Sequence, residues 1–260
     1  MQSTTRYGGM ENAGCIFYAE RAIRGDGMME ELIAHEIAHQ WFGNSATESD
    51  WEHLWLSEGF ATYMTHLYIE NKYGEERFKD ELGKDRQTVF HFYDQHVLPV
   101  VDTLSTDLLF RLNANAYQRG AWVLHMLRSE LGTDAFWKGI QQYYSEYDYS
   151  NATTDEFIEV MEQSSGKDLS QFTTQWLRTG VLPELKLSWK LKRKKATFEL
   201  LQVQEEFVFQ FPIDLTIDYV DGTSETIVLN LNSEKLVHTM NVKSKIKHIE
   251  LDRNKKILFH

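Results

Sequence analysis

Two histidines stand four residues apart in the segment HEIAHQWFG, residues 35–43. On a helix, side chains four positions apart lie one turn above each other, so His35 and His39 can offer ring nitrogens to one ion. Glu36 lies beside that face, where a carboxylate can accept a proton from a metal-activated water molecule. The spacing indicates a zinc site, and the alternative is a helix that carries two histidines by chance.

A third ligand is expected because a catalytic zinc usually has three protein ligands and one water molecule. Eighteen residues separate His39 from Glu58, which lies in the segment LWLSEGFAT. That interval lets a first helix end and a second helix bring a carboxylate beside the histidines. An unpaired carboxylate would be costly in this apolar stretch, whereas a metal ion would neutralise it. We therefore predict one Zn²⁺ per chain, bound by His35, His39 and Glu58, over the alternative that Glu58 is an exposed helical residue.

Apolar residues recur at helical spacing from residue 28 to about residue 180. The predicted zinc ligands fall on two of the resulting helices, at 28–43 and 50–74. Asp50 is a candidate N-cap of the second helix, and Gly74 follows its end. Further helices are expected at about 75–96, 113–131, 134–147, 154–164 and 168–178. The pattern predicts a mainly helical domain over residues 1–182.

The pattern changes after Pro183. Alternating or β-branched segments, typical of strands, occupy residues 184–191, 207–220, 224–231, 235–242 and 246–252. The dipeptide Asp221-Gly222 lies between two of these segments and is a hairpin signal. We interpret the basic run KLKRKK, residues 190–195, as a solvated strand end or turn. An antiparallel, β-sandwich-like module is therefore expected over residues 183–260, which makes the chain α+β.

Composition narrows the classes of partner. The chain has 260 residues and is 42% hydrophobic, enough to bury a substantial core in one large or two smaller domains. Its net charge of −12 is concentrated in residues 1–180, which hold 28 acidic and 14 basic side chains. An acidic region of this kind repels phosphate, so we expect no nucleic-acid partner.

Membrane and export signals are not found in the sequence. No apolar run approaches the roughly 20 residues of a membrane span, and MQSTTRYGGMEN lacks the charged and apolar regions of a signal peptide. Cys15 is the single cysteine, so an intrachain disulfide is excluded. We expect a soluble protein with no membrane partner. Its compartment stays open, with the cytoplasm favoured.

With these motifs in place, the chain resembles the M1 family of zinc aminopeptidases, gluzincins with an HExxH-x18-E zinc motif. The segment YGGMENAG is similar to that family's GxMEN exopeptidase motif, which falls here on Gly8, Gly9, Met10, Glu11 and Asn12. The segment AYQRGAWVLHMLRSELG resembles the family segment with a catalytic tyrosine, Tyr117 here. FTTQWLRTGVLPELKLSW resembles the join between the helical region and a β-sandwich domain. The resemblance implies a thermolysin-like zincin catalytic domain.

Roles for individual residues follow from the resemblance. Glu11 would bind the substrate's α-ammonium group, and Tyr117 would stabilise the oxyanion, with Glu36 as the proton acceptor. The segment 8–12 could pair with the peptide as an added strand, for which Gly8 and Gly9 leave space. Without the resemblance, Glu11 is an ordinary loop carboxylate and Tyr117 is a core aromatic residue.

The chain also departs from the family pattern. Family members carry a long β-rich region before the GxMEN motif, whereas this chain begins seven residues before Gly8, so we expect an N-terminal truncation relative to the family. Residues 12–20 would then form an unprotected strand edge through which molecules could self-associate. Ser57 and Arg119 stand where the family commonly has Asn and Lys, but neither is a predicted metal ligand or reacting group.

The predicted function is that of a zinc-dependent aminopeptidase, which hydrolyses the N-terminal peptide bond of peptides with a free N-terminus. Two alternatives stay open. One is a related gluzincin epoxide hydrolase, which would use the same zinc and tyrosine. The other is a non-catalytic or weakly active M1-like fragment that serves as an interaction module. The intact set of His35, Glu36, His39 and Glu58 argues against an inactive scaffold.

Overall fold

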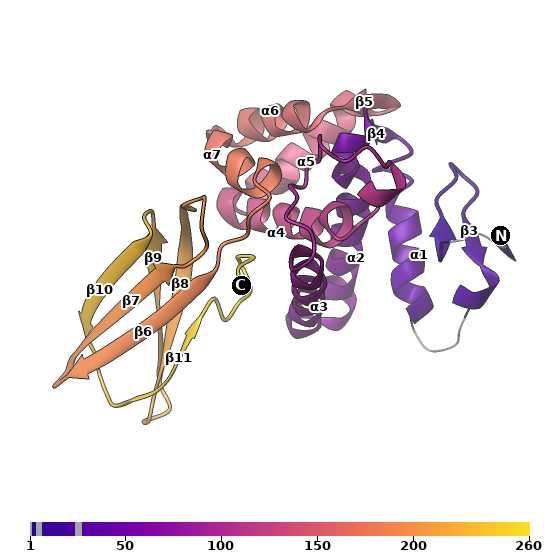
Figure 1. The fold of residues 1–260 in the computed structure, drawn as a ribbon. Coiled ribbons are helices and arrows are strands. Elements are labelled where there is room, and N and C mark those ends of the chain that lie inside the picture. Colours follow the sequence, from indigo (N-terminus) through magenta and orange to yellow (C-terminus); the bar gives the residue numbers. More distant parts are fainter. Residues whose placement is uncertain (1, 4–6, 24–27) are drawn as a thin grey trace. The chain divides into compact units, whose positions relative to one another are not determined.

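The computed structural model describes residues 2–3, 7–23 and 28–260. The chain divides into two compact units, Met1–Gly180 and Val181–His260. Helices dominate the first unit and strands make up the second (Figure 1). Within the described ranges, no helix is both long and apolar enough to cross a membrane.

Seven α-helices lie in the described part of the first unit. Their bounds are α1 (Met28–Ala38), α2 (Trp55–Tyr73), α3 (Glu75–Tyr93), α4 (Gly120–Leu131), α5 (Thr133–Tyr147), α6 (Thr154–Ser165) and α7 (Ser170–Thr173). Local sequence fixes several ends. Thr153 and Glu156 form a capping box at the start of α6. Gly74 ends α2 with a φ of 90°, as predicted, because this conformation suits glycine.

The helix α2 is the centre of the first unit and packs against α1, α3 and α4. Small and apolar residues cover nearly all of its first three turns, and Trp55, Phe60 and Ala61 are fully buried. Gly59 of α2 meets Gly120 at the start of α4, where a Cβ on Gly59 would lie 2.9 Å from the Gly120 Cα. The two helices therefore touch backbone to backbone, immediately beside Glu58.

The boundaries of the two helices that carry the predicted zinc ligands differ from the sequence predictions. α1 ends at Ala38 and not at residue 43, because the chain turns there through Gly43, whose φ is 122°. The His39 N–H still donates to the His35 carbonyl (3.2 Å), so the one-turn spacing of the histidines is kept. The helix predicted from residue 50 begins at Trp55, and Asp50 instead caps a preceding 3₁₀ turn.

A small three-stranded sheet precedes α1. Its strands are β1 (Gln2–Ser3), β2 (Gly9–Met10) and β3 (Phe17–Ala19), in the order β1-β3-β2. β3 is paired on both sides, so the free strand edge expected near residues 12–20 is not found there. The edge positions instead belong to β1 and β2. A second, two-stranded parallel sheet joins β4 (Ala46–Glu48) to β5 (Ser150–Ala152).

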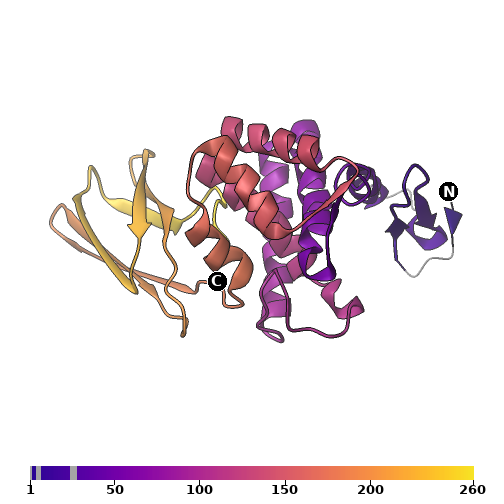
Figure 2. The same ribbon diagram turned by 90° about the horizontal axis from the view of Figure 1, so that it is seen from above.

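Two antiparallel sheets form the second unit, and Figures 1 and 2 show them as its two layers. One has the order β10-β7-β6 and the other β11-β8-β9. Their bounds are β6 (Leu185–Lys192), β7 (Lys195–Gln202), β8 (Phe211–Tyr219), β9 (Ser224–Leu231), β10 (Lys235–Asn241) and β11 (Ile246–Leu251). Alternate residues of β7 and β8, including Phe198 and Leu215, are fully buried and form the core of this unit.

β7 is a strand that the sequence analysis does not predict. Its inward residues Ala196, Phe198 and Leu200 alternate with more exposed ones, which is the expected pattern for a strand with one buried face. The basic run KLKRKK adjoins β7 and makes this alternation difficult to recognise in the sequence. That run forms the end of β6 and the turn into β7, where Arg193 has a φ of 58°. The interpretation of KLKRKK as a strand end or turn is confirmed.

We expect Gly59→Ala to destabilise the protein. The added Cβ would lie 2.9 Å from Gly120 Cα and 3.1 Å from the Ala116 carbonyl oxygen, and these backbone atoms cannot move aside easily. Overpacking of this kind costs about 1–3 kcal/mol of unfolding free energy, which urea titration measures. Gly139→Ala is the comparison, because its Cβ would meet the flexible Met161 side chain. Equal losses in both variants would contradict the backbone contact.

Candidate functional site

Three potential metal ligands converge where α1 meets α2. His35 Nε2 lies 3.0 Å from His39 Nε2, and Glu58 Oε2 lies 3.3 Å from the first nitrogen and 3.2 Å from the second. No other group of three or more such side chains could hold a metal ion within the described residues. The structure thus brings together the three residues that the sequence singled out as zinc ligands.

The spacing of these atoms fits a zinc ion. Ligand atoms about 2.1 Å from a tetrahedral ion are separated from one another by about 3.4 Å, which is close to the three distances observed. The donor set of two imidazoles and one carboxylate is also one that zinc prefers. Burial alone would raise the pKa of Glu58, but hydrogen bonds from His35 and His39 lower it to about 2. The carboxylate is therefore ionised and ready to bind a cation.

A hydrogen bond on its far side orients the His39 ring. Its Nδ1 donates to the Phe42 carbonyl at 3.0 Å, and Ser57 Oγ lies 3.3 Å from the same nitrogen. Burial lowers the pKa of His39, but its hydrogen bond to Glu58 raises it to about 9, so without a metal the ring also carries a proton on Nε2. A metal ion would replace that proton, and the hydrogen bond at Nδ1 would keep Nε2 directed at the ion. The turn through residues 39–43, which shortens α1, thus supplies the acceptor that fixes the imidazole.

The Glu36 carboxylate is buried beside this centre without a fixed partner. Its side chain is 5% exposed, and no described residue hydrogen-bonds to Oε2. Burial raises the pKa of Glu36 to about 7, because desolvation outweighs the attraction of His39. The carboxylate packs directly over Gly9, where a Cβ would lie 2.0 Å from Oε1. Only glycine fits at that position while Glu36 keeps this place.

Side chains from the turn after α1 hold the segment that follows β2. Gln40 Nε2 donates to the Glu11 carbonyl at 2.9 Å, and Asn44 Nδ2 donates to the same oxygen at 2.5 Å. The Gln40 Oε1 also accepts the Gly14 N–H at 2.8 Å. From the sequence, Asn44 is expected to be structural and Gln40 has no assigned role. Only the folded chain shows that the two side chains reach residues 26 to 33 positions away.

Tyr117 lies in a π-helical turn, Asn115–Arg119, directly before α4. Its hydroxyl donates a 2.8 Å hydrogen bond to Glu58 Oε1, and its ring stacks on the His35 imidazole with centroids 6.0 Å apart. Burial and the Glu58 carboxylate raise the pKa of Tyr117 well above its usual value, so the hydroxyl stays protonated. Turns of this kind occur frequently at functional sites.

A cavity of about 510 Å³ joins these groups. It is lined by Tyr7, Gly8, Gly9, Met10, Glu11, Leu32, His35, Glu36, His39, Glu48, Trp51, Leu54, Ser57, Glu58, Leu109, Leu112 and Tyr117. Every predicted site residue is among them except Asn12, whose carbonyl accepts the Cys15 N–H at 2.8 Å. Glu48 is a lining carboxylate that the sequence analysis does not single out, because no motif or spacing marks it.

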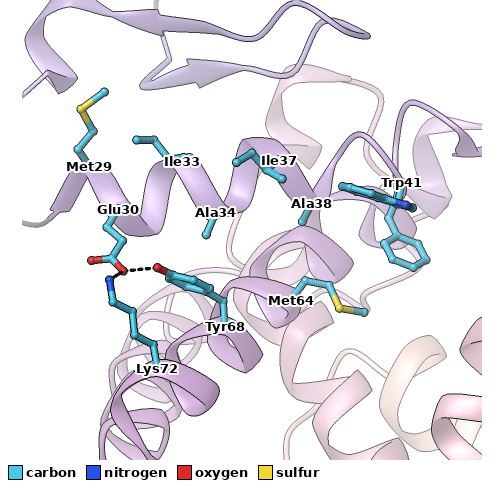
Figure 3. A pocket seen from close by; sticks show the side chains of 11 residues that line it. Met29, Glu30, Ile33, Ala34, Ile37, Ala38, Trp41, Met64, Tyr68 and Lys72 are labelled. Carbon is cyan, nitrogen blue, oxygen red and sulfur yellow. Dashed lines mark hydrogen bonds and ion pairs between the residues drawn. The ribbon is translucent and has the colours of Figure 1, made fainter.

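A second cavity, of about 670 Å³, uses other residues of α1 (Figure 3). Its walls are mostly apolar side chains, among them Ile37 and Trp41 of the α1 region and Met64 of α2. Glu30 accepts hydrogen bonds from Tyr68 and Lys72 at its edge. This cavity contains no residue of the three-ligand cluster, so the chemistry expected from His35, His39 and Glu58 belongs to the first cavity.

We expect Glu48→Gln to stabilise the metal-free protein at pH 8. Burial raises the pKa of Glu48 from 4.5 to about 7, so the folded state binds the proton more tightly than the unfolded state does. The cost of burying the charge is therefore absent below about pH 4.5 and complete above about pH 7. The variant should gain roughly 3 kcal/mol of unfolding free energy at pH 8 and nothing at pH 4. Urea titrations giving equal gains at both pH values would contradict this assignment.

Comparison with known proteins places these observations in a family. Residues 2–176 match the Peptidase family M1 domain. Probable aminopeptidase 2 of Sulfurisphaera tokodaii is 32% identical over 95% of this chain and 32% of that protein. Leucyl aminopeptidase of Saccharolobus solfataricus is 30% identical over 92% of this chain and 32% of that protein. The chain spans about a third of the length of these curated relatives.

The fold has a counterpart among solved structures. The crystal structure of Legionella pneumophila aminopeptidase A in complex with aspartic acid matches 98% of this chain and 30% of its own, with a TM-score of 0.78 and 22% identity. This likeness confirms the predicted architecture, a mainly helical zincin domain followed by an antiparallel β module. The Peptidase family M1 domain matches residues 2–176, which is well over half of this chain. The chain therefore belongs to peptidase family M1.

Proposed function

We propose that the chain carries the catalytic centre of a zinc aminopeptidase, which hydrolyses the N-terminal peptide bond of peptides. One observation carries this proposal. The cluster of His35, His39 and Glu58, the unpartnered Glu36 carboxylate and the edge strand β2 all line a single cavity. The names of the relatives, which are aminopeptidases, support the same reaction.

The metal would be held by His35 Nε2, His39 Nε2 and Glu58 Oε2, which leaves a fourth coordination position free in a tetrahedral site. Zinc, when bound, polarises the scissile carbonyl and lowers the pKa of a coordinated water molecule. The hydrogen bond from His39 Nδ1 to the Phe42 carbonyl keeps the metal-binding nitrogen aimed at the cluster.

Glu36 would move the proton in the reaction. Its raised pKa, about 7, is close to neutral pH, where one carboxylate can both accept a proton and release it. The free Oε2 atom is available for this exchange, because Gly9 confines the side chain without hydrogen-bonding to that atom. Glu36 would take the proton from the attacking water and deliver it to the leaving amine. The Tyr117 hydroxyl would donate a hydrogen bond to the developing oxyanion.

The substrate would be bound in register by β2 and Glu11. β2 is an edge strand, so the extended backbone of a peptide can pair with Gly9–Met10. The Glu11 side chain lines the same cavity, and its backbone is fixed by Gln40 and Asn44. We propose that Glu11 binds the substrate's α-ammonium group. A fixed anion in the same cavity as the zinc cluster would limit cleavage to the first peptide bond.

We expect Glu58→Gln to weaken zinc binding by more than about 100-fold. Changes that only disturb the partners of metal ligands already cost 10–100-fold, and this substitution replaces the charged ligand itself. Zinc affinity is measured by competition with a chromophoric chelator. Glu52→Gln is the matched control, because Glu52 does not line the cavity. Full zinc affinity in the Glu58 variant would remove this residue from the ligand set.

Glu36→Gln is expected to keep zinc and lose hydrolysis. The amide is nearly isosteric but cannot accept the proton, so kcat for an aminoacyl p-nitroanilide should fall by roughly 10²–10⁴-fold. Zinc content per chain should stay unchanged. Glu31→Gln on the same helix serves as the control, since Glu31 pairs with Arg77 at the surface. Turnover at the parent rate in the Glu36 variant would exclude Glu36 as the proton acceptor.

A further inference from the structure

We propose that Glu48 binds the cationic side chain of the substrate's first residue, so that the site selects peptides with N-terminal Lys or Arg. This inference deepens the proposed function and rests on it. It concerns the cavity of about 510 Å³ that also holds the zinc cluster. Glu48 reaches this cavity from the end of β4, a different element from those that carry the three ligands.

The cavity presents four carboxylates, and three of them already have proposed roles. Glu58 belongs to the metal cluster, Glu36 exchanges the proton, and Glu11 faces the α-ammonium group. Glu48 is the fourth, and it does not belong to the cluster of potential metal ligands. Among the described lining residues there is no Lys or Arg. Burial raises the pKa of Glu48 more than the charge of His39 lowers it, so this charge does not neutralise Glu48 fully.

The hydrogen bonds of Glu48 are incomplete. Its Oε2 is buried and has no partner among the described residues. Buried carboxylates are normally paired, because an uncompensated charge in such a place costs stability. The raised pKa of Glu48 reflects the same cost, with desolvation as its main cause. Groups that are retained at such a cost are concentrated at functional sites. A ligand ammonium or guanidinium group would satisfy this oxygen.

The walls of the cavity match the rest of a Lys or Arg side chain. Apolar side chains from three parts of the chain line it, including Trp51, Leu54, Leu109 and Leu112. Lys and Arg combine an apolar stem with a charged end, so the stem can pack on these walls while the charge meets Glu48. An α-ammonium group has no such stem. The combination of apolar walls and a carboxylate therefore favours side-chain recognition by Glu48.

Binding of L-lysinamide and L-norleucinamide tests the proposal. The two amides share a four-carbon side chain, and only lysinamide carries a terminal ammonium group. Affinities are measured by calorimetry at pH 8 on the zinc-loaded chain with the Glu36→Gln substitution, so that neither ligand is turned over. A hydrogen bond to a charged partner changes binding affinity by roughly 10–100-fold. We expect lysinamide to bind tighter by this factor, and Glu48→Gln to bring the ratio close to one.

Three results would overturn the proposal. The first is that lysinamide and norleucinamide bind with equal affinity when Glu48 is intact. The second is a preference for lysinamide that survives Glu48→Gln. The third is that Glu48→Gln lowers the affinity for both ligands equally. The third result would mean that Glu48 holds the α-ammonium group or the fold. Glu52→Gln is the control for overall charge, and it should leave the ratio unchanged. Thermal unfolding of the Glu48 variant shows whether it is folded, and Glu48→Met provides a second neutral replacement.

A kinetic comparison separates this proposal from the proposed function. Lysyl and norleucyl p-nitroanilides are assayed with Glu36 intact. Hydrolysis of both substrates without a Glu48-dependent preference for lysine would overturn the inference and leave the aminopeptidase activity in place. A Glu48-dependent preference in binding with no hydrolysis of either substrate would overturn the proposed function and leave the binding site in place.

Discussion

The attraction between the Glu58 carboxylate and two imidazoles is the interaction on which the site depends. Glu58 is 8% exposed and lies among the buried residues at the start of α2, where an unpaired charge would be costly. His35 and His39 lower its pKa to about 2 despite this burial. A centre with this charge and shape is ready for a metal ion.

The packing around His35, His39 and Glu58 holds these three side chains close together. α2 touches α4 through paired glycines beside Glu58, so the carboxylate sits on a backbone that cannot slide. The turn after α1 fixes the His39 ring, and its side chains also tie down the segment after β2. Gly9 brings that segment against Glu36. The proposed substrate-binding edge and the proposed proton acceptor therefore share one support with the candidate metal centre.

Much of this arrangement is predictable from the sequence, because it depends on regular spacing. Helical periodicity places the ligands on two adjacent helices, and strand alternation reveals most of the second unit. Other features depend on contacts between distant residues. Gln40 and Asn44 donate hydrogen bonds to the Glu11 carbonyl, which is far away in the sequence. Glu48 is recognised as a candidate only because the folded chain places it in the wall of the cavity. The prediction of a free strand edge near residues 12–20 is wrong at β3, because β1, which is not adjacent to it in the sequence, pairs with β3.

The central claim is that α1 and α2 bring His35, His39 and Glu58 to a single zinc ion. Anomalous diffraction at the zinc absorption edge, on crystals of the zinc-loaded chain, tests it most directly. The account predicts one anomalous peak per chain, within about 2.0–2.2 Å of His35 Nε2, His39 Nε2 and a Glu58 carboxylate oxygen. A fully loaded chain whose peak lies elsewhere, or whose Glu58 points away from the ion, would contradict it.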